Sequence, residues 1–405
     1  MTSQAMHYRW WVLFASTVTQ LSAALASQGI GVWGSLAQQR FALTNTQLGL
    51  LAGLANAVPA IGLLVIGRLL DRYGERGPVF AGMVVLTIAM LLLGEVSGFA
   101  LLIVAMLLIG VGYSPIQPGG SKAIYHWFPP TQRGFAMGIR QAALPLGGAC
   151  AAALFPPLIR WQGWHVAMLV AAGCLAAGAG LFVVLYRNAV PSRRPDGPAR
   201  FSQRLLQPMH RQVFRQVASI GVVMVAAQTA VSMFWILFVE RHFGVSFFRG
   251  AELLVVVQMA GTVGRVALSA LSDRFIHGRQ RVVYGAAAVI VIMLVLMNVM
   301  PIALSSWALG LASSIIGFFG FGWYGPWVVW LSETCAADEV GEVLAAAMAL
   351  NQVAIAVTPF AFGFLLDATS AFQGAWLGHA GLISLVLLAV FHQRSSSGRP
   401  ISTAP

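Results

Sequence analysis

One arginine stands inside an otherwise apolar stretch of the chain. Arg140 follows Arg133, where that stretch begins, by about two helical turns, so it would lie roughly 10 Å into a helix. An arginine at that depth is costly in hydrocarbon unless it faces a cavity or a partner. Because a planar guanidinium binds a carboxylate through two parallel bonds, we expect Arg140 to bind an anion. Snorkelling, or a bond to helix carbonyls, is the alternative.

Other polar residues in apolar stretches could also bind a solute. Lys122, the chain's sole lysine, is a second candidate anion ligand, although its long stem could equally reach the membrane surface. The uncharged candidates share a hydrogen-bonding amide or hydroxyl group and are Gln117, Tyr113, Tyr324, Asn351, Gln228, Gln20 and Gln28. A bond between helices is an equal alternative for each amide. Tyr113 and Gln117 are four residues apart and share a helix face.

The residue patterns that enzyme, metal or cofactor sites would need are missing from the sequence. No Asp or Glu falls in the middle of an apolar stretch, and the three cysteines have no paired spacing. No Ser-His or His-Glu-x-x-His arrangement is present, so we expect neither an enzyme nor a metal or cofactor site.

The composition requires a membrane. Of 405 residues, 58% are hydrophobic and 9% charged, with a mean hydropathy of +0.79. Such a chain cannot cover itself with polar surface in water, so we expect an all-α protein with the lipid bilayer as a partner. Twelve apolar stretches are long enough to span it, near 9–31, 47–67, 78–97, 99–126, 133–158, 164–187, 213–239, 250–271, 281–300, 303–331, 342–366 and 374–392.

A polar interval divides the twelve stretches equally. Residues 188–212 are rich in Pro and Arg and cannot form an apolar span. We therefore expect a six-helix bundle over 1–187, a cytoplasmic linker over 188–212 and a second six-helix bundle over 213–405. With both termini in the cytoplasm, nineteen Lys and Arg lie on that side and four on the other. This bias predicts a multi-pass protein of the cytoplasmic (inner) membrane, and it accounts for the net charge of +12 without a nucleic-acid partner.

A charged segment between the second and third stretches recurs in the second half. The first copy runs from Gly67 to Arg76, and the second places Asp273 at an offset of 202 from Asp71. Further matches, such as Tyr113 with Tyr324, keep the same order, so the chain is a duplication. Read as G-x-L-x-D-R-x-G-x-R, the segment resembles the loop between helices 2 and 3 of the major facilitator superfamily.

That resemblance implies a gating role for the charged loops. In the family, the loop pairs with charges at the ends of neighbouring helices and favours the outward-facing state. The residues that match this pattern here are Gly67, Asp71, Arg72, Gly74, Arg76, Asp273, Arg274 and Gly278, with Arg133 and Glu342 as expected mates. Anchoring of the topology by arginines is the alternative, although it does not explain Asp71 and Asp273.

The resemblance also implies a secondary transporter that works by alternating access. The net positive interior favours a small anionic solute of the carboxylate type, and the family default is coupling to protons; uniport and exchange stay open. An efflux transporter for drugs or metabolites is one alternative. Against it, Met106 stands where many antiporters of the family carry Arg, and their helix 5 pattern is only partly present. A non-transporting membrane sensor is the alternative of another class.

Overall fold

The computed structural model describes residues 3–188, 208–275, 278–300, 305–335 and 339–397, and this part of the chain contains helices and no strand. The first half contains α1 (Ser3–Ser27), α2 (Ile30–Phe41), α3 (Asn45–Tyr73), α4 (Arg76–Gly94), α5 (Phe99–Tyr113), α6 (Ile116–Trp127) and α7 (Pro130–Leu185). The second half contains η2 (Pro208–His210), α9 (Gln212–Phe243), α10 (Phe247–Ser272), α11 (Gly278–Val299), α12 (Ser306–Gly322), α13 (Tyr324–Ser332), α14 (Val340–Thr369) and α15 (Phe372–Ser397). Most of the predicted linker lies outside the described residues, so the domain boundaries stay a prediction.

These helices make twelve membrane spans. Among the described residues, nine helical segments are long and apolar enough to cross a membrane, and the bent helix α3 makes ten. Helix α7 supplies two spans because the chain turns at Gly163, whose φ of 86° and ψ of 169° are not helical. Helices α1 and α2 together supply the last span, so the twelve-helix prediction is confirmed.

Two helices extend beyond the apolar stretches from which they were predicted. The first span continues through Gln38 and Gln39 to Phe41, and α3 continues through the charged residues to Tyr73. A helix that projects from the hydrocarbon needs no apolar side chains, so hydropathy underestimates its length. The expected turn from Gly67 to Arg76 is therefore helical up to Tyr73, and the chain leaves the helix at Gly74, with φ of 72°.

The fourth span is broken where proline predicts a break. Helix α5 ends at Tyr113 and α6 begins at Ile116, after Pro115, which has no backbone N–H to donate. The tenth span is divided at Trp323 into α12 and α13. The two breaks fall next to Tyr113 and Tyr324, the two tyrosines that correspond in the duplicated sequence.

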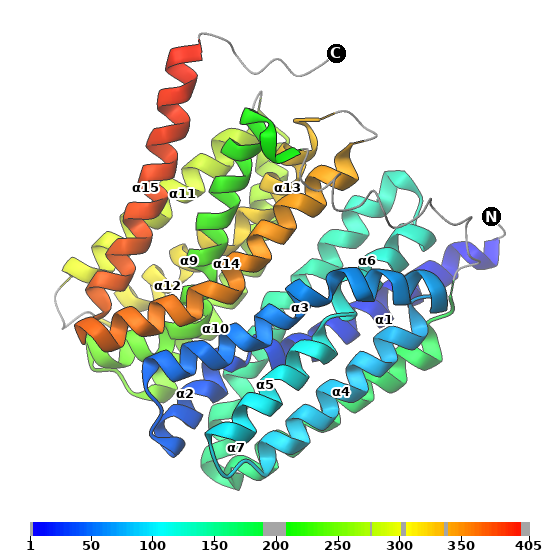
Figure 1. The fold of residues 1–405 in the computed structure, drawn as a ribbon, viewed down its shortest axis with the longest axis horizontal. Coiled ribbons are helices and arrows are strands. Elements are labelled where there is room, and N and C mark those ends of the chain that lie inside the picture. The colour runs from blue at the N-terminus through cyan, green and yellow to red at the C-terminus, as the bar shows by residue number, and fades with distance from the viewer. Residues whose placement is uncertain (1–2, 189–207, 276–277, 301–304, 336–338, 398–405) are drawn as a thin grey trace.

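The two halves lie side by side and are joined mainly along two helix pairs. Figure 1 shows α3 of the first half running along α14 of the second, and α7 also packs against α10. We call the side with the ends of α3, α6, α10 and α13 the terminal face, and the side with the beginnings of α3, α10 and α15 the opposite face. At the opposite face, Asp367 of α14 accepts hydrogen bonds from the backbone N–H groups of Asn45 and Thr46. The halves are therefore fastened together at that face.

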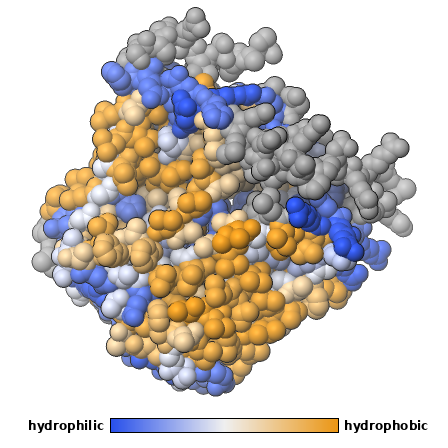
Figure 2. Space-filling model, in the orientation of Figure 1, coloured by the Kyte–Doolittle hydropathy of each residue, from blue (hydrophilic) through white to orange (hydrophobic). Residues whose placement is uncertain are grey.

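The terminal face has a different pattern of ion pairs. Those formed by the described residues there stay within one half, as in Lys122 with Asp71 and Arg211 with Glu339. Apolar side chains cover much of the side of the molecule between the two faces, where Figure 2 shows a broad hydrophobic surface with hydrophilic residues gathered toward its ends. Helix α4 also has exposed apolar residues, such as Val84 and Ile88, as expected of a helix that faces lipid.

Candidate functional site

Arg140 lies at the centre of a buried polar cluster in the first half. Its guanidinium group is fully buried, and its Nη2 atom donates to Gln20 Oε1 at 2.8 Å, to the carbonyl of Ile116 at 2.9 Å and to that of Gln117 at 3.0 Å. Its Nη1 atom donates to Ser121 Oγ at 3.1 Å. All of these acceptors are neutral, and no carboxylate among the described residues lies within ion-pair distance of Arg140. The positive charge is therefore bound but not neutralised.

A glycine makes room for this guanidinium group. A Cβ atom on Gly120 would lie 2.3 Å from Arg140 Nε and 2.6 Å from Nη2, so Arg140 packs directly against the backbone of α6. The carbonyls that it binds belong to the first turn of α6, next to the break at Pro115. Arg140 thus holds the broken fourth span against α7 and α1.

The predicted neighbours of Arg140 join the same cluster. Gln20 also donates to the hydroxyl of Tyr113 at 2.8 Å, and Gln117 donates to Gln141 Oε1 at 3.1 Å. Tyr113, Gln117 and Gln141 are only partly buried, so they separate the buried arginine from more open space. Four residues singled out from the sequence, Arg140, Gln117, Tyr113 and Gln20, therefore occupy one site.

A second arginine reaches this site from the other half. Arg265 of α10 donates from Nη1 to the carbonyl of Gln141 at 3.0 Å, and its Cζ lies 5.7 Å from the centre of the Tyr324 ring. It is partly buried, and its Nε atom has no hydrogen-bond partner among the described residues. Arg265 is one of the nineteen basic residues that the sequence assigned to the cytoplasmic side, because it precedes the second charged loop. Seven residues of α10 separate it from the helix end at Ser272, a depth that could have revealed it.

Lys122 lies apart from the cluster. Its ammonium group is 2.7 Å from Asp71 Oδ1 and 3.9 Å from Glu75 Oε1, and it donates to the carbonyl of Leu70 at 3.0 Å. It therefore connects the end of α3 to α6 at the terminal face. Adjacent positions on a helix point about 100° apart, so Ser121 can bind Arg140 while its neighbour Lys122 points away from the cluster.

The remaining predicted amides make no hydrogen bond to the Arg140 cluster within the described chain. Asn351 is almost fully buried in α14, and neither its oxygen nor its nitrogen has a partner among the described residues. The Oε1 atom of Gln228 in α9 also lacks one there. Gln28 lies between α1 and α2, close to Gly148 of α7.

The first charged loop forms contacts inside the first half. Besides Asp71 with Lys122, Arg72 lies over the ring of Tyr73 at 5.2 Å, and Arg76 donates to the carbonyl of Val183 at 2.6 Å. Gly67 lies within α3, where a Cβ atom would meet nothing.

Glu75 of the same loop was not singled out from the sequence. It is 2% exposed, accepts a bond from the hydroxyl of Tyr186 at 2.9 Å and lies 3.1 Å from His126 Nδ1. In the pattern G-x-L-x-D-R-x-G-x-R, Asp71 falls on a defined position and Glu75 on a variable one, so the resemblance did not point to Glu75.

The second charged loop and the expected mates are placed as follows. Arg279, not Arg274, pairs with Asp273 at 3.2 Å, and it also pairs with Glu333 at 2.8 Å. Gly278 begins α11, and Glu342 lies in the first turn of α14. Arg133 donates to the carbonyl of Phe128 at 3.0 Å and lies 3.8 Å over the ring of Tyr125. No described contact joins Asp71 to Arg133 in this conformation.

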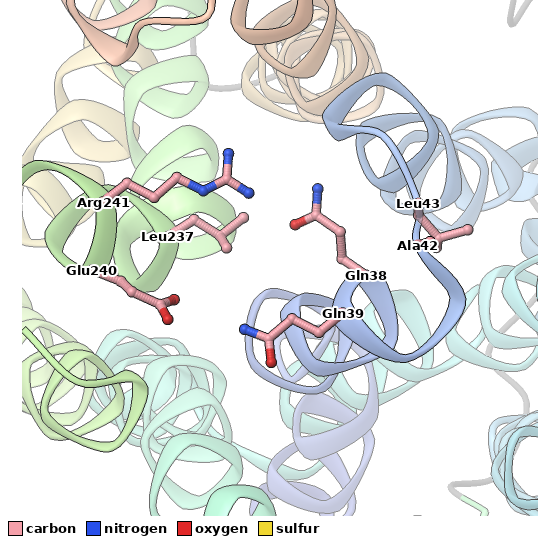
Figure 3. Close-up of a pocket in the computed structure, with 7 residues that line it drawn as sticks. All are labelled: Gln38, Gln39, Ala42, Leu43, Leu237, Glu240 and Arg241. Carbon is pink, nitrogen blue, oxygen red and sulfur yellow. The ribbon is translucent and has the colours of Figure 1, made fainter. Parts of the chain in front are cut away.

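Two hollows lie at the opposite face, away from the Arg140 cluster. One, of about 310 Å³, lies between α2 and α9, where Figure 3 shows Arg241 and Gln38 pointing toward each other from the two halves. A second, of about 500 Å³, is lined by Arg241, His242, Asn45, Asp367 and residues that begin α15. They show where solvent reaches the closed seam between the halves.

Known proteins resemble this chain over most of its length. A protein named Probable sulfoacetate transporter SauU from Cupriavidus necator is 24% identical over 88% of this chain and 89% of its own length. The hexuronate transporter of Bacillus subtilis is 24% identical over 90% of each chain. An uncharacterized MFS-type transporter of Mycobacterium tuberculosis is 30% identical, but over 55% of this chain and only 50% of its own length.

Solved structures show the same fold. The nucleoside transporter NupG superposes with a TM-score of 0.79 at 13% identity, over 94% of this chain and 99% of its own. A bacterial homolog of the human lysosomal transporter Spinster, in an inward-facing and occupied conformation, superposes with a TM-score of 0.70 at 16% identity, over 95% and 96%. The sequence profile of the Major Facilitator Superfamily matches residues 16–359. This chain therefore belongs to the Major Facilitator Superfamily, and it is a multi-pass membrane transport protein and not an enzyme.

Proposed function

We propose that this protein is a secondary transporter that carries a small organic anion by alternating access. The observation that carries the proposal is the pair Arg140 and Arg265. Both lie inside the bundle, and neither is within ion-pair distance of a carboxylate among the described residues. Two uncompensated guanidinium groups in a site of low dielectric constant favour an anion.

The two arginines have different roles in the proposal. Arg265 is partly exposed at the contact between the halves, whereas Arg140 is not, so Arg265 contacts the charged end of the solute directly. Arg140 is fully enclosed in this conformation, so it acts on the solute through its positive field and through the positions of Gln117 and Tyr113. It contacts the anion directly only if Gln117 moves aside during the transport cycle. Tyr324 and Gln141 complete the wall of the site.

The relatives support a solute of this class. Two of them are named as transporters of sulfoacetate and hexuronate, which are both organic anions. The rival proposal of cation efflux gains nothing from the site, where no described carboxylate lies beside either arginine. A sensor without transport has no observation that favours it.

Orientation and coupling complete the proposal. The excess of Arg on the terminal face supports a cytoplasmic location for that face, both termini and the linker. Without Arg265, basic residues on the cytoplasmic side still far outnumber the four on the other side. The halves are fastened at the opposite face, so the proposed state of this conformation is closed on the side away from the cytoplasm. Protons are the proposed coupling ion, and uptake into proteoliposomes with and without a pH gradient tests that step.

The proposed function is tested by measuring which solutes bind to the purified protein. We expect carboxylates and sulfonates to raise the melting temperature and lipophilic cations to leave it unchanged. A charge-assisted bond is worth about 1.5–3 kcal/mol, and each 1.4 kcal/mol is a factor of ten in affinity. Arg265→Gln should therefore weaken binding of the best anion ten-fold or more.

Variants at Arg249 and Arg140 serve as the control and the comparison for Arg265→Gln. Arg249→Gln removes an arginine from the exposed beginning of α10, where it pairs with Glu252, and should leave affinity unchanged. Arg140→Gln should weaken binding of the anion more than binding of its neutral amide analogue. Arg140→Lys should restore only part of the lost affinity, because lysine lacks the planar guanidinium group. Binding of cations in preference to all tested anions, or an unchanged affinity in Arg265→Gln, would contradict the proposal.

A further inference from the structure

Helices α7 and α10 face each other with matching positions. Gln141 and Gly148 are seven residues apart on α7, and Gln258 and Arg265 are seven apart on α10, so each pair shares a helix face about two turns, or ~10 Å, apart. Arg265 bonds to the carbonyl of Gln141, while Gln258 Nε2 lies 2.8 Å from the position of a Cβ on Gly148. Gln258 therefore lies two turns from Arg265 along the same seam between the halves.

The amide of Gln258 is buried without a partner. Its side chain is 1% exposed, and neither Oε1 nor Nε2 makes a hydrogen bond to the described residues. It lies near the middle of α10, at the depth where transporters built from repeats bind their solutes. Buried amides in folded proteins usually have hydrogen-bond partners. Because the amide of Gln258 has none among the described residues, its donor and its acceptor are both available to a ligand.

A second glutamine, Gln28, approaches the same turn of α7 from the first half. The Cβ of Gln28 lies 3.3 Å from the position of a Cβ on Gly148, and Gln28 is partly exposed between α1 and α2. The absence of a side chain at Gly148 lets Gln28 and Gln258 approach the same turn of α7. One glutamine thus comes from each half.

We propose that Gln258, together with Gln28, recognises hydroxyl groups on the tail of the transported anion, whose charged end lies at Arg265. An amide offers both a donor and an acceptor, which suits a hydroxyl group, whereas an apolar tail would leave Gln258 unsatisfied. The preferred solute is then a hydroxylated carboxylate long enough to reach from the arginine to the amides. This inference rests on the proposed function and adds the basis of selectivity within it.

Matched pairs of anions test the inference. D-glucarate and adipate are both six-carbon dicarboxylates, and D-gluconate and hexanoate are both six-carbon monocarboxylates, so each pair differs mainly in hydroxyl groups. In the wild-type protein we expect calorimetry to show at least ten-fold tighter binding of the hydroxylated member in one pair or both. Gln258→Leu should bring that ratio close to one by weakening the hydroxylated member alone. Arg265→Gln should weaken both members by a similar factor.

Controls separate selectivity from stability. Gln258→Leu exchanges a partnerless amide for an apolar group of similar size, so the melting temperature without ligand should stay level or rise. If this variant fails to fold, Gln258→Met removes the amide with an unbranched side chain. Gln216→Leu removes another buried amide, which lies near the beginning of α9 and donates to Gln393 of α15. This variant should leave the ratio unchanged.

The outcomes distinguish this inference from the function on which it rests. If no anion binds to the wild-type protein, the proposed function fails, and this inference fails with it. If anions bind and Arg265→Gln weakens them, but wild type does not favour the hydroxylated members, only the inference about Gln258 is overturned. Equal loss of both members in Gln258→Leu would also overturn it.

Discussion

The guanidinium group of Arg140 lies against Gly120, and this contact leaves no room for a side chain on α6. Gly120→Ala would place a methyl group 2.3 Å from Arg140 Nε, so the arginine or the helix must move. Such overpacking typically costs about 1–3 kcal/mol of stability. We expect the melting temperature to fall and anion affinity to fall with it, measured by thermal unfolding and calorimetry.

A matched glycine on α7 provides the control. Gly138 lies within a helix as Gly120 does, but a Cβ atom there would meet nothing within 4 Å. Gly138→Ala should leave affinity unchanged and keep or slightly raise stability, because alanine favours helix by about 1 kcal/mol over glycine. If Gly120→Ala binds the anion as tightly as Gly138→Ala does, the packing of Arg140 does not set the site.

At the scale of single residues, the sequence predicted which side chains are out of place in hydrocarbon but not where they point. Arg140, Gln20 and Gln117 stood out because each is polar within an apolar stretch, and they meet in one cluster. Lys122 was a candidate anion ligand with the membrane surface as the alternative, and in this conformation it pairs with Asp71. Arg265 was assigned to the cytoplasmic side, and it donates to the carbonyl of Gln141. Both lie several residues before a helix end, where a cation can reach either the surface or the interior. The rotation of the helix about its own axis decides which of the two the cation reaches, and the mean hydropathy of a stretch does not give that rotation.

At the scale of elements, the first charged loop is connected to the site through α6. Lys122 binds Asp71 and the end of α3, and the next residue, Ser121, binds Arg140. The ion pair is partly solvated, with Asp71 66% exposed, so it is worth at most about 1 kcal/mol. Asp71→Asn should therefore unfold almost as the wild type does, yet lower the transport rate far more than solute affinity, because it disturbs the gate and not the site.

Rates in proteoliposomes and affinities in detergent check this expectation. Lys122→Gln removes the other partner and should reproduce the effect, whereas Glu95→Gln changes an exposed acid at the opposite face, beside His165, and should not. Loss of affinity with unchanged turnover of bound solute would show that the loop acts on binding and not on gating.

At the scale of the whole molecule, the sequence predicted more of the fold than of the contacts between halves. Span number follows from hydropathy, and the breaks at Pro115 and Gly163 follow from residues with special backbones. The contacts of Asp367 with the beginning of α3 could not be predicted, because nothing in the sequence relates two helix ends that lie far apart in the chain. Such contacts depend on the conformation, whereas the hydrophobic pattern is the same in every conformation of the transport cycle.

Asp367 bridges the two halves at the closed seam on the opposite face. Its carboxylate accepts bonds from the backbone N–H groups of Asn45 and Thr46 and from Asn45 Nδ2, so it caps the positive end of α3 from the other half. Asp367→Asn keeps the shape but removes the charge and replaces one acceptor by a donor. A solvent-exposed cap of this kind is worth about 1 kcal/mol, which corresponds to a roughly five-fold shift in a two-state population.

Spin labels across that face measure the shift directly. With labels at Gln39 of α2 and Gln373 of α15, both exposed, Asp367→Asn should increase the fraction of long distances, because the halves separate more often at the opposite face. Glu252→Gln is the matched control, since Glu252 is also exposed at this face but pairs with Arg249 of its own helix, so it fastens nothing between halves. Identical distance distributions for Asp367→Asn and wild type would mean that the packing of α3 against α14 alone holds the seam closed. A shift in both variants would mean that loss of any negative charge at this face opens it.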